Sequence, residues 1–199
     1  NFLQTFWEPI KKGILFSLSL QNRNGAIAWN IDKSKKIDED YLLTGCSSIA
    51  KSLECAIAIC QVLEHKSFES EWRDAHLKLI VALENPAEIF DLKKDRSRFS
   101  MDWYYPILGG INSKERITSL VEMIKTSFWI KGLGIKCVAD EPWVTVAETS
   151  ECSIAFKKIG EDKIALELLF NAIAIVDGQG IPYMGWQFDE NIYWPEETP

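Results

Sequence analysis

An eight-residue segment that occurs twice constrains the fold of this chain more than any other feature of its sequence. Ser52–Ile59 returns as Thr149–Phe156, and the Glu, Cys, Ile and Ala of each copy are identical. Both copies lie in an apolar helical stretch that is followed by a short polar turn and a second helix. Reuse of one helical unit is typical of helical-repeat folds, so the sequence predicts an all-α protein built from helical hairpins.

Composition limits the classes of protein to which the chain can belong. Its 199 residues are 47% apolar and include eight Trp, which predicts one domain with a sizeable core. The net charge of −7, without a segregated basic patch, argues against nucleic-acid partners. The five cysteines are an odd number and lie mostly in apolar stretches, which favours a reducing, cytoplasmic location. No apolar run resembles a membrane-spanning segment of roughly 20 residues.

Hydrophobic periodicity predicts helices that alternate between nearly apolar and amphipathic, as expected for an inner and an outer layer. We expect these helices over Pro9–Leu20, Gly45–Glu64, Glu69–Leu83, Met101–Ile111, Lys114–Phe128, Val144–Ile159 and Asp162–Val176. Gly134–Val138 is the one candidate strand. Thr198 and Pro199 form the start signal of another helix, which predicts a fragment truncated at its C-terminus. Because Asn1 is not Met, an upstream truncation stays open.

Two segments resemble the QW-type repeat of terpenoid cyclases. One is Lys12–Phe16 followed by Gln21, Gly25 and Trp29, and a degenerate copy is Asp177–Gly180 followed by Tyr183 and Trp186. In such a repeat, Gly permits the tight turn and the aromatic side chain clamps it between neighbouring helices.

The whole chain also resembles bacterial prenyltransferase-like proteins of the terpenoid cyclase and protein prenyltransferase superfamily. The stretches that carry this resemblance are Leu43–Ser48, Met101–Pro106, Asp140–Thr149 and Trp194–Glu197. The resemblance implies a single α/α-toroid domain of the six-hairpin type over residues 1–199. It also implies a prenyltransferase or terpenoid cyclase that acts on an isoprenoid, with a small-molecule or lipid-linked substrate.

The sequence departs from that family at its chemical motifs. The Asp-x-Asp-Asp acid of squalene-type cyclases is matched only by Asp38–Tyr41, which ends in Tyr. Protein prenyltransferases hold zinc with Asp, Cys and His, whereas His65 and His76 are the only histidines here. We therefore expect neither a metal nor another cofactor.

Acidic and aromatic residues stand together before each predicted inner helix. These clusters are Asp38–Tyr41, Asp102–Tyr105, Asp140–Trp143, and Asp189, Glu190 and Tyr193–Glu197. In a toroid the starts of the inner helices share one rim, so the clusters would converge on one acidic, aromatic pocket. Converging carboxylates can have their pKa values pushed apart and supply an acid and a base. The structural alternative is that carboxylates simply favour helix N-termini.

The two copies of the repeat disagree at an informative position, where Lys51 in the first is opposite Glu148 in the second. An unpaired charge in an apolar helix needs a partner or a cavity, so either both face a shared cavity or they pair with each other. The repeated Glu54 and Glu151 are expected to be structural and to anchor backbone amides of a neighbouring loop.

These observations define a candidate site and leave three functions open. The candidate catalytic residues are Asp102, Glu148 and Asp140. The candidate substrate-binding residues are Lys51, Trp103, Tyr104, Trp143, Tyr183, Trp186, Trp194 and Glu196. The leading hypothesis is the prenyltransferase or cyclase. The alternatives are a carbohydrate-active enzyme on a six-hairpin barrel, with two carboxylates about 5 to 9.5 Å apart, and a non-catalytic lipid- or glycan-binding module.

Overall fold

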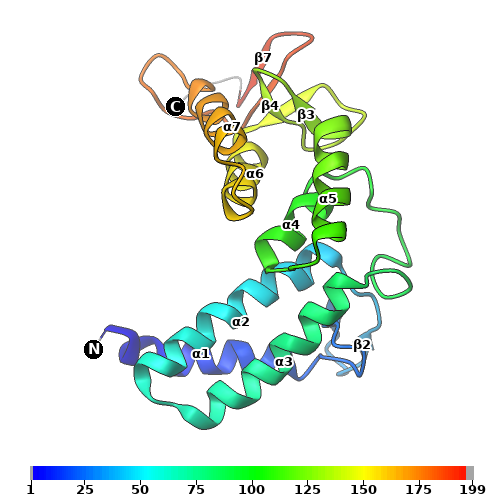
Figure 1. Cartoon of the computed structure of the whole chain (residues 1–199), viewed down its shortest axis with the longest axis vertical. Helices are drawn as coiled ribbons and strands as arrows, with labels where there is room; N and C mark the ends of the chain where they lie inside the picture. Colours follow the sequence, from blue (N-terminus) through cyan, green and yellow to red (C-terminus); the bar gives the residue numbers. More distant parts are fainter. Residues whose placement is uncertain (1, 196–199) are drawn as a thin grey trace. The chain divides into compact units, whose positions relative to one another are not determined.

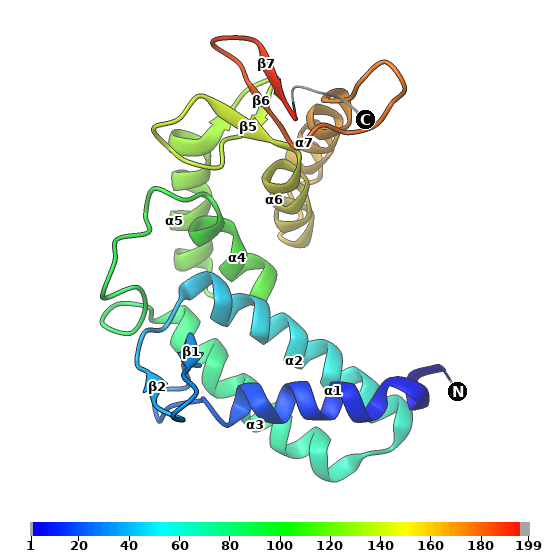
Figure 2. The same ribbon diagram turned by 180° about the vertical axis from the view of Figure 1, so that it is seen from behind.

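The computed structural model describes residues 2–195, which are mainly helical (Figures 1 and 2). This part of the chain contains seven α-helices, one short π-helix and seven short strands. The predicted helical character is confirmed, but a purely all-α fold is wrong, because the strands form three small antiparallel sheets. The chain divides into two compact units, one of Asn1–Asp95 and Gly109–Asn112 and the other of Arg96–Leu108 and Ser113–Pro199.

The first unit is built around a hairpin of two long helices. Its elements are α1 (Phe2–Leu18), β1 (Asn30–Ile31), β2 (Ile37–Asp38), α2 (Leu43–Leu63) and α3 (Lys66–Glu84). The hairpin turns at Glu64, which adopts a left-handed φ of 62° and donates its N–H to the last turn of α2. Trp72 of α3 is fully buried. Trp7 of α1 stacks on His65 with 4.0 Å between ring centroids and also contacts Trp72, so aromatic packing fixes α1 against the hairpin.

One described helix, α2, is long and apolar enough to cross a membrane by length and composition alone. This differs from the expectation that no apolar run approaches that length. Core helices of soluble proteins satisfy the same criterion, and α2 packs against α1 and α3. The criterion is therefore weak evidence, and the absence of a membrane-spanning segment stays a prediction.

A tight turn after α1 explains the spacing of Gln21 and Gly25 in physical terms. The Gln21 side-chain amide donates to the carbonyl oxygens of Gly25 and of Ala75 in α3, both at 2.9 Å, and so ties the turn to the hairpin. Gly25 has a φ of 90° and lies against the backbone of Lys78, where a side chain has no room. Trp29, expected to clamp this turn, is instead 61% exposed.

The second unit contains the same turn after its last helix. In the first unit the Asn22 N–H donates to the Ala26 carbonyl, and the Asn22 side chain accepts the Ala26 N–H. In the second unit the Asp177 N–H donates to the Ile181 carbonyl, and the Asp177 side chain accepts the Ile181 N–H. The two segments that resemble each other in sequence therefore share one backbone conformation.

The second unit surrounds another helical hairpin with short strands. Its elements are α4 (Met101–Gly109), α5 (Lys114–Met123), the π-helix η1 (Ile124–Phe128), β3 (Trp129–Ile130), β4 (Gly134–Ile135), β5 (Trp143–Thr145), α6 (Val146–Lys158), α7 (Asp162–Ala174), β6 (Gly185–Gln187) and β7 (Ile192–Trp194). The candidate strand in Gly134–Val138 is present as β4. Ser113 caps α5 by accepting the Arg116 N–H, as its position at the start of a helix predicts.

The repeated segment occupies equivalent places in the two units. Ser52–Ile59 lies within α2 and Thr149–Phe156 within α6, and each helix is followed by a turn and a second helix that packs against it. This prediction is confirmed. The buried faces nevertheless differ, since Cys55 is exposed and Cys152 is fully buried. We attribute the difference to β4 and β5, which cover α6 in addition to α7.

Candidate active site

The three-stranded sheet of the second unit places two tryptophans on one face. In its register Trp143 lies opposite Gln187, Thr145 lies opposite Gly185, and Gly185 lies opposite Trp194. Side chains alternate between the faces of a sheet, and directly paired residues share a face. Trp143, Thr145 and Trp194 therefore project from the same face, with the bare backbone of Gly185 between Thr145 and Trp194.

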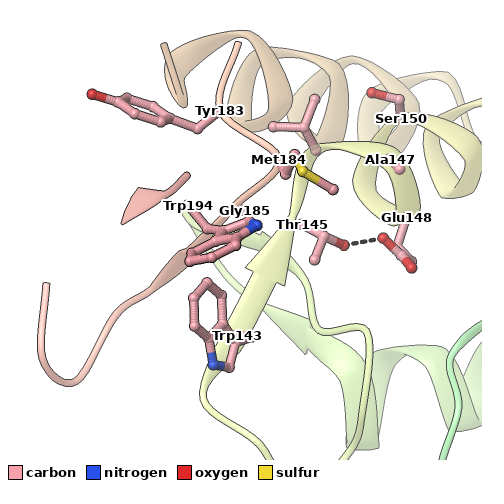
Figure 3. Close-up of a pocket in the computed structure, with 10 residues that line it drawn as sticks. Trp143, Thr145, Ala147, Glu148, Ser150, Tyr183, Met184, Gly185 and Trp194 are labelled. Atoms are coloured by element: carbon pink, nitrogen blue, oxygen red, sulfur yellow. Dashed lines mark hydrogen bonds between the residues drawn. The ribbon is translucent and has the colours of Figure 1, made fainter. Parts of the chain in front are cut away.

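This face of the sheet and the start of α6 enclose a pocket of about 510 Å³ (Figure 3). Its lining consists of Trp143, Thr145, Val146, Ala147, Glu148, Ser150, Tyr183, Met184, Gly185 and Trp194. Figure 3 shows the tryptophans on the strand side and Glu148 on the helix side. Among these residues Glu148 carries the one carboxylate. The pocket thus combines a single acidic group with an aromatic and aliphatic wall.

Glu148 is held by a group that donates a hydrogen bond to it. It is the third residue of α6, and Thr145, the residue that precedes the helix, donates its hydroxyl to the Glu148 carboxylate. The Cys137 thiol lies close enough to this carboxylate for its charge to act on the thiol. Burial, followed by the Glu148 charge, raises the pKa of Cys137 to about 12. The thiol therefore stays protonated near neutral pH and does not act as a nucleophile.

Glu151 lies one turn further along α6 and is held by two phenol groups of α4. Tyr104 donates its hydroxyl to Glu151 at 2.8 Å, and Tyr105 does so at 3.2 Å. Tyr104 is fully buried. Burial, then the bond to Glu151, raises the pKa of Tyr104, and the same effects of burial and Glu151 raise the pKa of Tyr105. Both phenols stay neutral donors, and together they tie α4 to α6.

These contacts correct two expectations about the repeated charges. Lys51 is exposed and forms an ion pair with Glu54 of its own helix at 2.6 Å, so it is not a buried charge in need of a cavity. The expected partners of Glu54 and Glu151 were backbone amides, whereas the structure shows a lysine and two tyrosine hydroxyls. The expectation for Lys51 failed because α2, although its composition is apolar, has an exposed side on which Lys51 lies.

The other predicted acids lie away from the lining of this pocket. Asp140 is exposed and accepts a two-pronged set of hydrogen bonds from Arg98, with both of its oxygens 2.9 Å from one guanidinium nitrogen. This pairing with Arg98 lowers the pKa of Asp140. Asp102 is 7% exposed, in the first turn of α4. Their catalytic roles stay predictions.

The predicted aromatic residues divide between the pocket and its surroundings. Trp143, Tyr183 and Trp194 line the pocket. Trp186 lies on the opposite face of the sheet, where it stacks on Tyr193 with 5.6 Å between centroids.

Two further predicted binding residues have other contacts. Trp103 donates its indole N–H to the Ser97 carbonyl, and Tyr104 binds Glu151 as described above. Glu196, the last of the predicted binding residues, lies outside the described residues.

Six of the residues that line the pocket were absent from the sequence-based prediction, among them Thr145, Met184 and Gly185. Thr145 could have been found, because Thr145 and Glu148 have the spacing of a helix-capping pair. Met184 and Gly185 could not, because they reach the pocket only through pairing between β5 and β6, which are far apart in sequence.

Comparison with known proteins overturns the resemblance stated above. No protein-family model matches the sequence. The chain is 36% identical, over 197 residues, to the MMP endo-(1,4)-3-O-methyl-alpha-D-mannosidase of Mycolicibacterium hassiacum. The aligned region covers 99% of this chain and 53% of that enzyme, so the chain spans about half the length of the curated relative that it matches.

The predicted relationship to prenyltransferase-like proteins, and the isoprenoid chemistry drawn from it, are therefore wrong. The signals behind it were glycines in tight turns, acids near helix starts and aromatic residues between helices. Any protein built from helical hairpins needs such residues, so they indicate an architecture and not a reaction. The similarity favours the carbohydrate-active alternative instead.

Proposed function

We propose that this chain belongs to a glycoside hydrolase that cleaves 1,4-linked α-mannosides within an oligosaccharide, and that the pocket around Glu148 is its active site. The observation that carries the proposal is similarity to a mannosidase along nearly the whole chain. The pocket supports it independently, because an open site with a carboxylate beside aromatic side chains suits a sugar ring, whose C–H faces stack on indoles.

Hydrolysis of a glycosidic bond needs an acid that donates a proton to the glycosidic oxygen. It also needs a base that removes a proton from the attacking water. Glu148 is the side chain in the pocket that can carry out such a transfer, acting as the general acid or the general base. Its contact with Thr145 fixes the carboxylate in the first turn of α6. Because burial and the Glu148 charge raise the pKa of Cys137 to about 12, this thiol does not compete as a nucleophile.

Such hydrolysis uses two carboxylates about 5 to 9.5 Å apart across the scissile bond. The described lining of the pocket supplies only Glu148. Glu196, two positions after Trp194 in the sequence and outside the described residues, stays a sequence-based candidate for the second carboxylate. We further propose that the helical hairpins belong to a six-hairpin α/α toroid, supported by the equivalence of α2–α3 and α6–α7.

The proposal predicts that the protein shortens 1,4-linked α-mannose oligosaccharides and releases internal fragments. The measurement is chromatography of the products over time, with prenyl diphosphates and 1,4-linked β-mannose oligosaccharides as control substrates. Oligosaccharide fragments from the α-linked substrate alone are the expected result. No fragments from any 1,4-linked α-mannoside, methylated or free, would reject the proposed function.

A further inference from the structure

The last helix of the second unit carries an exposed apolar face. Four large side chains of α7 stand three or four residues apart, the spacing that aligns side chains along one side of a helix. They are Leu166, Leu169, Phe170 and Ile173, and each is between 43% and 63% exposed. Large apolar side chains that gather on the surface in this way mark an interaction site. We call these four residues the α7 ridge.

The first unit carries an apolar groove. Helices α1 and α2 lie side by side (Figure 2), and a groove of about 510 Å³ lies between them. Its small lining residues are Gly13, Ser17, Ser52 and Ala56. Nothing lies within 4 Å of the point that a Cβ atom on Gly13 would occupy, so the groove is open there. We call it the α1–α2 groove.

Two phenylalanines extend the apolar surface beyond one end of the α1–α2 groove. Phe6 precedes the groove residues Pro9 and Ile10 by three and four positions, so it shares their side of α1. Phe2 lies one turn before Phe6, with 4.9 Å between the ring centroids. The two side chains are 74% and 46% exposed. The apolar surface therefore runs along much of α1.

The α7 ridge and the α1–α2 groove have the complementary shapes that helices use to pack. Side chains three and four residues apart form ridges, and helices pack by fitting such ridges into grooves. Small residues such as Gly13 and Ser52 permit close approach of another helix, while large ones such as Phe170 fill the space. A third helix seated in the groove would remove apolar surface from water on both partners.

The length of the related mannosidase indicates how much helical chain such surfaces accommodate. The aligned region covers 53% of that enzyme, so almost as much chain lies outside the alignment as within it. A second copy of the present chain supplies a comparable length. It also brings a ridge for the groove of the first copy and a groove for its ridge. Two reciprocal contacts of this kind close a two-fold dimer, the commonest assembly of soluble proteins.

We propose that the protein pairs with a second copy of itself, with the α7 ridge of each copy seated in the α1–α2 groove of the other. The inference does not depend on the proposed function, because it rests on exposed apolar surfaces and not on the pocket around Glu148.

Sedimentation velocity over a concentration series tests the proposal. The wild type is expected to reach twice the 22.7 kDa mass of the chain. Phe170→Glu places a charge on the ridge and should raise the dissociation constant about 30-fold or more, the effect of losing a central contact. Cys55→Arg should do the same, because a long charged side chain would fill the groove. Both residues are exposed, so neither change should unfold the protein, and circular dichroism verifies this.

Helix α3 supplies a matched control. Val81 is 62% exposed, against 63% for Phe170, and belongs neither to the ridge nor to the groove lining. Val81→Glu therefore makes the same kind of change elsewhere on the surface. It should alter the dissociation constant by about twofold at most.

A mixture of the two interface variants distinguishes a ridge in a groove from a ridge against a ridge. The intact ridge of the Cys55→Arg copy can enter the intact groove of the Phe170→Glu copy, so mixing should restore a dimer that neither variant forms alone. A dimer held by two α7 ridges would instead be insensitive to Cys55→Arg, and that result would overturn the proposal.

Other results would also overturn the pairing. One is a wild type that stays monomeric up to roughly 1 mM, the limit of a very weak contact. Another is a monomer that sediments with phosphatidylcholine vesicles, which would assign the apolar face to a lipid surface. Failure of the proposed function looks different. Hydrolysis by a monomer rejects the pairing alone, whereas a dimer that matches these expectations and hydrolyses no mannoside rejects the proposed function alone.

Discussion

Glu148→Gln is expected to lower the rate of mannoside hydrolysis by about 100- to 10,000-fold, the usual contribution of a general acid or base. The amide keeps the size of the carboxyl group and can still accept the Thr145 hydroxyl, so the local structure should be preserved. What the variant loses is the carboxyl group that would transfer the proton. Initial rates of fragment release, measured for the wild type and the variant at equal concentration, give the ratio.

Glu115→Gln is the matched control for this change. Glu115 also lies in the first turn of a helix, α5, and accepts the hydroxyl of the residue that caps it, Ser113, at 3.3 Å. It does not line the pocket. The control should retain nearly full activity. If Glu148→Gln retained activity within about threefold of the wild type, far from the loss expected of a general acid or base, Glu148 would not be the catalytic group.

The largest effect on stability is expected for Gly25→Ala. The backbone at Gly25 has a φ of 90°, which an L-residue adopts at a cost of about 1 to 2 kcal/mol. The new Cβ would also stand within van der Waals overlap of the Lys78 carbonyl group in α3, and overpacking of this kind costs about 1 to 3 kcal/mol more. We expect the free energy of unfolding to fall by about 3 kcal/mol, measured by urea denaturation.

Gly180→Ala separates the two causes. Gly180 occupies the same position in the equivalent turn of the second unit, with a φ of 82°, but nothing lies within 4 Å of the point that a Cβ atom would occupy there. This variant should lose only the conformational part, about 1 to 2 kcal/mol. Equal losses in the two variants would show that the approach of the Gln21–Gly25 turn to α3 contributes nothing to stability.

The helices could be predicted from the sequence because their apolar positions repeat with the helical period over more than two turns. Apart from β4, the strands could not, since each spans only two or three residues, too few for alternation to be visible. The start of α1 was also missed. Pro9 suits a first turn, yet α1 begins at Phe2 and includes Pro9. The packing of Trp7 on His65 and Trp72 stabilises the additional turns.

Four of the ten residues that line the candidate site could be found from the sequence. Glu148 stood out because the two repeat copies differ there, and Trp143 and Trp194 because acids and aromatic residues cluster near the helix starts. Lys51 was expected to be a buried charge, but an apolar helix can still have an exposed side, and Lys51 pairs with Glu54 there. Its binding role stays a prediction. The substrate class could not be predicted from these residues, since turn glycines and stacked aromatics serve isoprenoids and sugars alike.

The most direct test of the central claim, that the pocket around Glu148 is a glycoside hydrolase active site, is a crystal structure of the Glu148→Gln variant with a 1,4-linked α-mannose oligosaccharide. The account predicts a glycosidic oxygen, or a water beside the anomeric carbon, about 2.6 to 3.2 Å from the side-chain amide that this substitution introduces. It also predicts a sugar ring against Trp194. An oligosaccharide bound elsewhere on the protein, with the pocket filled only by solvent, would contradict the account.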